Sequence, residues 1–140
     1  MRHYGLHVSI PQKTGIYKET PLTAMAFFLA SNQVWATPPA WSEREINRFC
    51  ESLDSCPVLT SRQIVVHGCY LLNPAADREE VRDKTAIRFI DEIKLCDQLH
   101  IGRYVFHPGS TRGETQQGLD QTIQLVKLGL ESGDFDRKYD

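Results

Sequence analysis

The sequence lacks the features that mark secreted, membrane-spanning or broadly basic chains. Its four cysteines include no CxxC pair, which argues against a disulfide framework and favours reduced thiols in an intracellular compartment. It has no low-complexity tract and no apolar run long enough to cross a membrane. Its formal net charge of −2 gives no general attraction to nucleic acid, so any DNA contact needs a local patch.

One apolar run, Leu22–Ala30, could imitate the core of a secretory signal. The segment before it is long, carries Pro11, Glu19 and Pro21, and begins with a strand-like pattern of its own. We therefore expect an intracellular protein without a membrane segment, located in the nucleus of a eukaryote or in the cytoplasm of a bacterium.

With 140 residues, 41% of them hydrophobic, the chain has the size and the apolar content of one domain. Four short apolar segments bounded by turn residues predict strands. These segments are Tyr4–Ser9, Ala24–Ala30, Gln63–His67 and Arg103–Phe106.

Segments with helical spacing or loop-forming residues follow these strands. Lys13–Thr20 predicts a loop or short helix, and Thr37–Ala40 a turn. Ser42 with Glu45 forms a capping box for a helix to about Leu53. A longer helix capped by Asp77 carries an apolar face, with its arginines and lysines mostly elsewhere, and a last helix spans Gln117–Leu130; the apolar face comprises Val81, Ile87, Ile90, Ile93 and Leu95.

Alternating strands and helices predict an α/β fold with parallel strands joined by right-handed crossovers. In such folds the carboxyl ends of the strands meet at one rim, where ligands bind. His67 and His107 each lie at the end of a predicted strand and would share that rim. Neutral imidazoles are common zinc ligands, but spacing alone leaves a zinc-binding role and a purely structural one equally open.

Several continuous motifs narrow the choice. They are Gly5-Leu6-His7-Val8-Ser9, Ala26-Phe27-Phe28-Leu29 with Asn32-Gln33 and Trp35, Val66-His67-Gly68-Cys69-Tyr70-Leu71-Leu72-Asn73, and Tyr104-Val105-Phe106-His107-Pro108-Gly109-Ser110-Thr111. Together with Phe89-Ile90-Asp91-Glu92 and Cys96-Asp97-Gln98-Leu99, they resemble the amino-terminal half of the endonuclease IV family over nearly the whole chain.

The resemblance implies four βα units of a xylose-isomerase-like TIM (β/α)8 barrel, as one partial domain over residues 1–140. It also implies a zinc-dependent apurinic/apyrimidinic endonuclease of base-excision repair, in which three zinc ions help to cut the DNA backbone 5′ to an abasic site. His67 and His107 match two zinc-ligand positions, and Tyr70, Asn32 and Gln33 match positions that contact double-stranded DNA. His7 matches a rim position that is not a ligand.

The sequence also departs from that family. Val34 stands where a basic residue often enters the duplex, and Ile10–Thr23 is shorter than the family's first turn and helix. The chain spans four βα units, whereas a closed barrel takes about 250 residues, and the family's remaining ligands, carboxylates and histidines, belong to the other half. We therefore expect the isolated chain to be inactive. The alternatives are an inactive half-barrel that self-associates through open sheet edges, and a metal site of the sugar-isomerase type.

Overall fold

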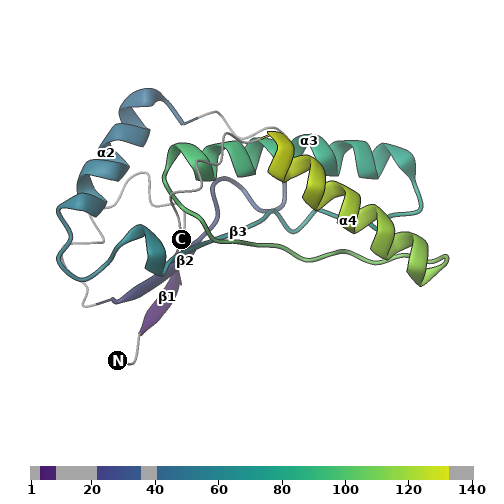
Figure 1. Cartoon of the computed structure of the whole chain (residues 1–140), viewed down its shortest axis with the longest axis horizontal. Coiled ribbons are helices and arrows are strands. Elements are labelled where there is room, and N and C mark those ends of the chain that lie inside the picture. Colours follow the sequence, from purple (N-terminus) through teal and green to yellow (C-terminus); the bar gives the residue numbers. More distant parts are fainter. Residues whose placement is uncertain (1–3, 9–21, 36–40, 133–140) are drawn as a thin grey trace.

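The computed structural model describes residues 4–8, 22–35 and 41–132. Its four strands form one parallel sheet in the order β1-β2-β3-β4, which confirms the predicted α/β class (Figure 1). The strands are β1 (Gly5–Val8), β2 (Ala24–Phe27), β3 (Ile64–His67) and β4 (Tyr104–Val105). The predictions for Lys13–Thr20 and Thr37–Ala40 lie outside the described residues.

The strands are shorter than the apolar runs predicted. The second was expected to reach Ala30, but it ends at Phe27 because the chain then turns; the Leu29 carbonyl instead accepts a hydrogen bond from Nε1 of Trp41 at 3.1 Å. The third begins at Ile64, since Gln63 belongs to the short 3-10 helix η2 (Ser61–Gln63). The fourth has two residues in the sheet.

The helices are α2 (Glu43–Asp54), α3 (Glu79–Gln98) and α4 (Thr115–Ser132). The capping box of α2 is confirmed, because the Ser42 amide donates to Oε2 of Glu45 at 2.7 Å and the Ser42 hydroxyl accepts from the Glu45 amide. The Ser42 hydroxyl, which donates to Oε2 of Glu45 at 2.7 Å, and the Ser42 amide together hold the pKa of Glu45 below its usual value. None of the helices within the described ranges has the length and apolar character of a membrane span.

Two predictions about α3 are wrong. Asp77 does not cap the helix, which starts after Arg78; its carboxylate instead accepts from the Thr111 hydroxyl at 2.9 Å and from the Arg112 amide. The apolar face is also rotated from the one predicted, since Ile87 is 60% exposed and Arg88 is buried. The sheet and α4 both pack against α3, and together they determine which of its side chains are covered. The spacing of apolar residues along the sequence does not show which neighbours a helix will have.

The core lies on one face of the sheet. Alternate residues of β2 and β3, namely Met25, Phe27, Ile64 and Val66, are buried against Phe49 and Leu53 of α2 and Leu95 and Cys96 of α3. A second cluster joins the loop after β3 to α3 and α4, which lie side by side (Figure 1), through Cys69, Leu72, Phe89 and Leu125. The opposite sheet face carries smaller or polar side chains and leads into the rim.

Candidate metal and nucleic-acid site

Five aromatic rings meet at the carboxyl end of the sheet. His67, the last residue of β3, lies with its ring centroid 5.3 Å from that of His107, 5.1 Å from Tyr70, 4.9 Å from Phe28 and 5.7 Å from His7. His107 follows β4 by two residues, so the two predicted histidines do share one rim. We call these five residues the ring cluster.

The spacing of the two imidazoles suits a common metal ion. Two imidazoles on one zinc, each with its nitrogen about 2.1 Å from the metal, have ring centroids roughly 5 Å apart at a tetrahedral angle. The observed centroid distance of 5.3 Å agrees with that arrangement. The His107 ring is exposed and that of His67 half-buried, so a metal could reach both.

A backbone contact orients the His67 ring. Nδ1 of His67 lies 2.8 Å from the carbonyl oxygen of Gly68. With the proton assigned to Nδ1 this is a hydrogen bond, and the lone pair of Nε2 is left for a ligand. A second partner of this kind is typical of metal-binding histidines.

The loops after β3 and β4 are joined by side-chain hydrogen bonds. The Asn73 side chain donates to the Ser110 carbonyl at 3.2 Å and accepts from the Ser110 amide at 3.1 Å. Gly109 has a φ of +80°, and a Cβ there would lie 1.9 Å from Oδ1 of Asn73, so this contact requires glycine. The loops that carry His67 and His107 are thus held in register with each other.

The predicted DNA-contacting residues reach the same rim by different routes. Tyr70 belongs to the ring cluster and is 49% exposed. Asn32 lies beside it, since its carbonyl accepts from the Tyr70 amide at 3.0 Å and from Sγ of Cys69 at 3.3 Å. Gln33 follows in the same turn with an exposed side chain.

Within the described ranges, no three His, Cys, Asp or Glu side chains are arranged to hold a metal ion. The donor set at the rim therefore fits part of a zinc site, because catalytic zinc takes three protein ligands and water. His7 lies in the ring cluster and packs on Phe28 at a centroid distance of 4.7 Å.

Residues 16–131 match the family described as the xylose isomerase-like TIM barrel. The chain belongs to this family. The crystal structure of endonuclease IV from Thermus thermophilus superposes with a TM-score of 0.74 at 27% sequence identity, over 91% of this chain and 47% of that one. The four-stranded sheet thus corresponds to part of an endonuclease IV barrel.

Curated relatives in the same family carry related names. The apurinic-apyrimidinic endonuclease 1 of Schizosaccharomyces pombe is 39% identical over 76% of this chain and 31% of its own length. The probable endonuclease 4 of Aquifex aeolicus is 33% identical over 91% of this chain and 45% of its own. The chain therefore spans less than half of either of these relatives, and the resemblance to the endonuclease IV family seen in the motifs is confirmed.

Sequence reasoning gave no role to Phe28, although a signal was present. Phe28 stands two residues after Ala26, whose partner in β1 is His7, and alternate residues of a strand share a face. The period-two pattern of β2 thus places the Phe28 ring over the rim, where it packs against three other rings of the ring cluster, His7, His67 and Tyr70.

Sequence reasoning also missed a polar network beneath the rim. Arg88, Glu92 and Tyr104 are linked there, and Tyr104 gains a raised pKa from its burial and from the neighbouring Glu92 carboxylate. Burial likewise raises the pKa of Cys69, which marks this thiol as a packing residue rather than a nucleophile.

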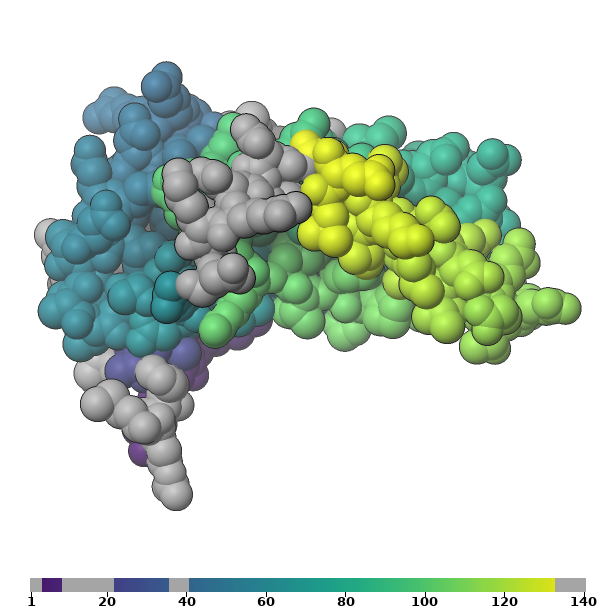
Figure 2. Space-filling view, viewed as in Figure 1, coloured from purple at the N-terminus to yellow at the C-terminus, as the bar shows by residue number. Residues whose placement is uncertain are grey.

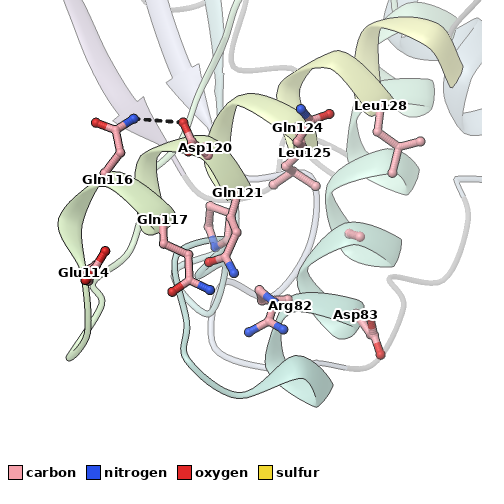
Figure 3. A pocket seen from close by; sticks show the side chains of 12 residues that line it. Arg82, Asp83, Glu114, Gln116, Gln117, Asp120, Gln121, Gln124, Leu125 and Leu128 are labelled. Atoms are coloured by element: carbon pink, nitrogen blue, oxygen red, sulfur yellow. Dashed lines mark hydrogen bonds between the residues drawn. The ribbon is translucent and has the colours of Figure 1, made fainter.

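A hollow of about 610 Å³ lies away from the rim, between α3 and α4 (Figure 3). Arg82 of α3 points toward Gln117 and Gln121 of α4, and Asp83 and Gln124 also line the hollow. Gln116 donates to Asp120 within α4 at 2.9 Å. The lining includes no member of the ring cluster, so we place the candidate site at the rim.

Proposed function

We propose that this chain supplies the amino-terminal part of a zinc-dependent apurinic/apyrimidinic endonuclease that cleaves DNA 5′ to an abasic site. His67 and His107 would be zinc ligands. The observation that carries the proposal is their 5.3 Å ring separation at the carboxyl ends of neighbouring parallel strands. The names of the relatives support the substrate.

Zinc suits the proposed reaction for two reasons. When bound, zinc would offset the negative charge of the phosphodiester and would supply a hydroxide nucleophile near neutral pH. In this scheme the two imidazoles hold the metal, with Nε2 of His67 directed by the Gly68 contact. The two imidazoles are one ligand short of the three protein ligands that a catalytic zinc takes.

On the DNA side, the Tyr70 ring would fill the space left by a missing base, and Asn32 and Gln33 would contact the backbone beside it. The partly exposed Tyr70 ring, fixed against Phe28 and His67, supports this role. Val34, which follows Asn32 and Gln33 in the loop after β2, is 47% exposed. Its side chain can insert an apolar surface into the duplex but carries no charge. We expect weaker distortion of the duplex than a basic residue there would produce.

Zinc binding by the purified chain tests the ligand assignment. We expect His67→Asn or His107→Asn to reduce zinc affinity at least tenfold, measured by competition with a chelating dye, because each removes one of the two assigned ligands. His7→Asn is the matched control, because His7 is in the ring cluster but is assigned no ligand role. Equal zinc affinity in wild type and both ligand variants would contradict the assignment.

Abasic-site cleavage tests the role of the missing ligands. We expect negligible incision of an abasic duplex by the pure chain, since its zinc ligand set is incomplete. Robust cleavage that EDTA abolishes would contradict this expectation. Binding of an abasic duplex in preference to simple sugars would separate the endonuclease from a sugar-isomerase-type site.

A second candidate role is association with another copy of this chain. In the described residues β1 and β4 each pair on one side, and parallel edges of this kind invite further pairing. The outward face of α4 adds four exposed apolar residues at helical spacing, Leu119, Ile123, Val126 and Leu130. Figure 2 shows that α4 lies open on this side of the molecule. Light scattering of the pure chain tests this role, and a monomer at all concentrations would contradict it.

A further inference from the structure

A buried ion pair lies directly beneath the ring cluster. Nε of Arg88 donates to Oε1 of Glu92 at 2.7 Å, and the two side chains are 3% and 1% exposed. Of the described residues these two are the charged ones that are buried. Desolvation of such a pair usually cancels most of its attraction, so stability alone explains its presence poorly.

Three other hydrogen bonds of the pair each reach a different rim segment. Oε2 of Glu92 accepts from the Tyr104 hydroxyl at 2.5 Å and from the Cys69 amide at 3.3 Å. Arg88 donates through Nη2 to the Ser31 carbonyl at 3.2 Å. One ion pair on α3 therefore holds the loop after β2, the loop after β3 and strand β4.

Each of these anchor points lies next to a residue of the candidate site. Ser31 precedes Asn32, Cys69 lies between His67 and Tyr70, and Tyr104 is three residues before His107. Gly68 permits the arrangement, because a Cβ there would lie 2.3 Å from the Tyr104 hydroxyl. The network thus stands between the packed helix layer and the ring cluster.

We propose that Glu92, oriented by Arg88, is a positioning residue that sets the spacing of the rim loops and so aligns His67, Tyr70 and His107. The inference rests on the proposed function, in which these three residues bind metal and DNA. Glu92 touches neither the metal nor the DNA in this scheme. It acts through the Cys69 amide and the Tyr104 hydroxyl, as partners one shell removed from a metal do.

The decisive variant is the double substitution Arg88→Met/Glu92→Leu. It replaces the pair with apolar side chains of similar length, which proteins often tolerate without loss of stability, while it removes all three anchors. The matched control is Lys84→Met/Glu80→Leu, an exposed pair with the same spacing on the same helix. Tyr104→Phe removes one anchor and leaves the ion pair in place, so it gives an answer if the double variant fails to fold.

Two readouts separate positioning from stability. We expect the double variant to lose at least tenfold in affinity for zinc, and its NMR spectra to lose the ring-to-ring contacts among His67, Tyr70 and His107. Tyr104→Phe should weaken the same contacts to a smaller degree, and the control pair should change neither. A merely structural role would lower the unfolding midpoint and leave both readouts unchanged in the folded protein.

The outcomes also separate this inference from the proposed function. If His67→Asn and His107→Asn leave the zinc affinity unchanged, the proposed ligand assignment fails, whereas the ring contacts still test the positioning role. If wild type, double variant and Tyr104→Phe share the same ring contacts, the positioning role is wrong, whatever the chain binds.

Discussion

Two regions of the molecule differ in how many contacts the described residues make there. The loops after β3 and β4 are joined by side-chain hydrogen bonds, whereas the outward face of α4 leaves apolar side chains exposed to solvent. In the loops, the Asn73 side chain makes two hydrogen bonds with the Ser110 backbone. The Asp77 carboxylate accepts hydrogen bonds from the Thr111 hydroxyl and the Arg112 amide. On α4, Leu119 and Leu130 remain 52% and 64% exposed. Hydrogen bonds within the chain therefore hold the rim loops in place, whereas the α4 face has exposed apolar surface that is available for further contacts.

The difference follows from position in the barrel architecture. Loops at the carboxyl ends of the strands carry chemistry and must hold side chains precisely, which short polar bridges achieve. The helices of a TIM barrel form an outer ring in which each has neighbours on both sides. Here α4 contacts α3 through Leu125 and Phe89, and the exposed stripe lies on its other face.

The largest expected effect tests the network beneath the rim by removing one partner of its buried ion pair. Glu92→Leu removes the carboxylate that faces the buried Arg88 guanidinium, and loss of one partner from a buried pair costs roughly 3–5 kcal/mol. We expect the free energy of unfolding, measured by urea titration, to fall by about that amount. Glu80→Leu is the control, because its pair with Lys84 is exposed and such pairs contribute little to stability. Similar losses in the two variants would contradict the special status of the buried pair.

A smaller effect is expected in the loop that carries His107. Gly109→Ala places a Cβ against Asn73 at a backbone angle that alanine rarely adopts, so we expect a loss of roughly 1–3 kcal/mol in urea titration. Gly113→Ala, four residues on, has its nearest neighbour atom 3.5 Å from the Cβ. It should change stability by about 0.5 kcal/mol or less. Equal effects would mean that the loop relaxes freely.

The sequence predicted the parts of the rim that depend on order along the chain. Both His67 and His107 lie where a predicted strand ends, and parallel strands bring such residues together, so the sequence alone predicts that the two rings lie close to each other. The packing of all five rings could not be predicted in this way, because it depends on where the chain turns after Phe27. At that turn the Leu29 carbonyl accepts a hydrogen bond from Trp41, twelve residues further on, and such a contact cannot be read from local sequence.

The buried pair shows a second limit. Arg88 and Glu92 have the spacing of a solvent-exposed helical pair, which is the commoner form, and nothing local distinguishes them from Glu80 and Lys84. Burial comes from contacts with Ser31 and Cys69, which are 57 and 23 residues away from their partners. Asp77 is a similar case. Its carboxylate accepts hydrogen bonds from Thr111 and Arg112, 34 and 35 residues further on, and does not cap α3.

The smallest effect on stability is expected on α4. Ile123→Lys with Leu130→Lys changes side chains that already face water, so each substitution should alter the free energy of unfolding by about 0.5 kcal/mol or less. Two added charges on the apolar stripe should instead oppose self-association, and light scattering should give a lower average mass than for the wild type at the same concentration.

The matched control for this double variant is Gln117→Lys with Gln124→Lys, which adds the same two charges, also seven residues apart, at exposed polar positions off the stripe. It should leave the average mass unchanged, because net charge alone then varies while the apolar surface stays intact. If the control lowers the mass as much as the stripe variant does, net charge and not the apolar stripe governs association, and the α4 face loses its place in the comparison with the rim. If neither variant changes the mass of an associating wild type, the sheet edges β1 and β4 carry the contact instead.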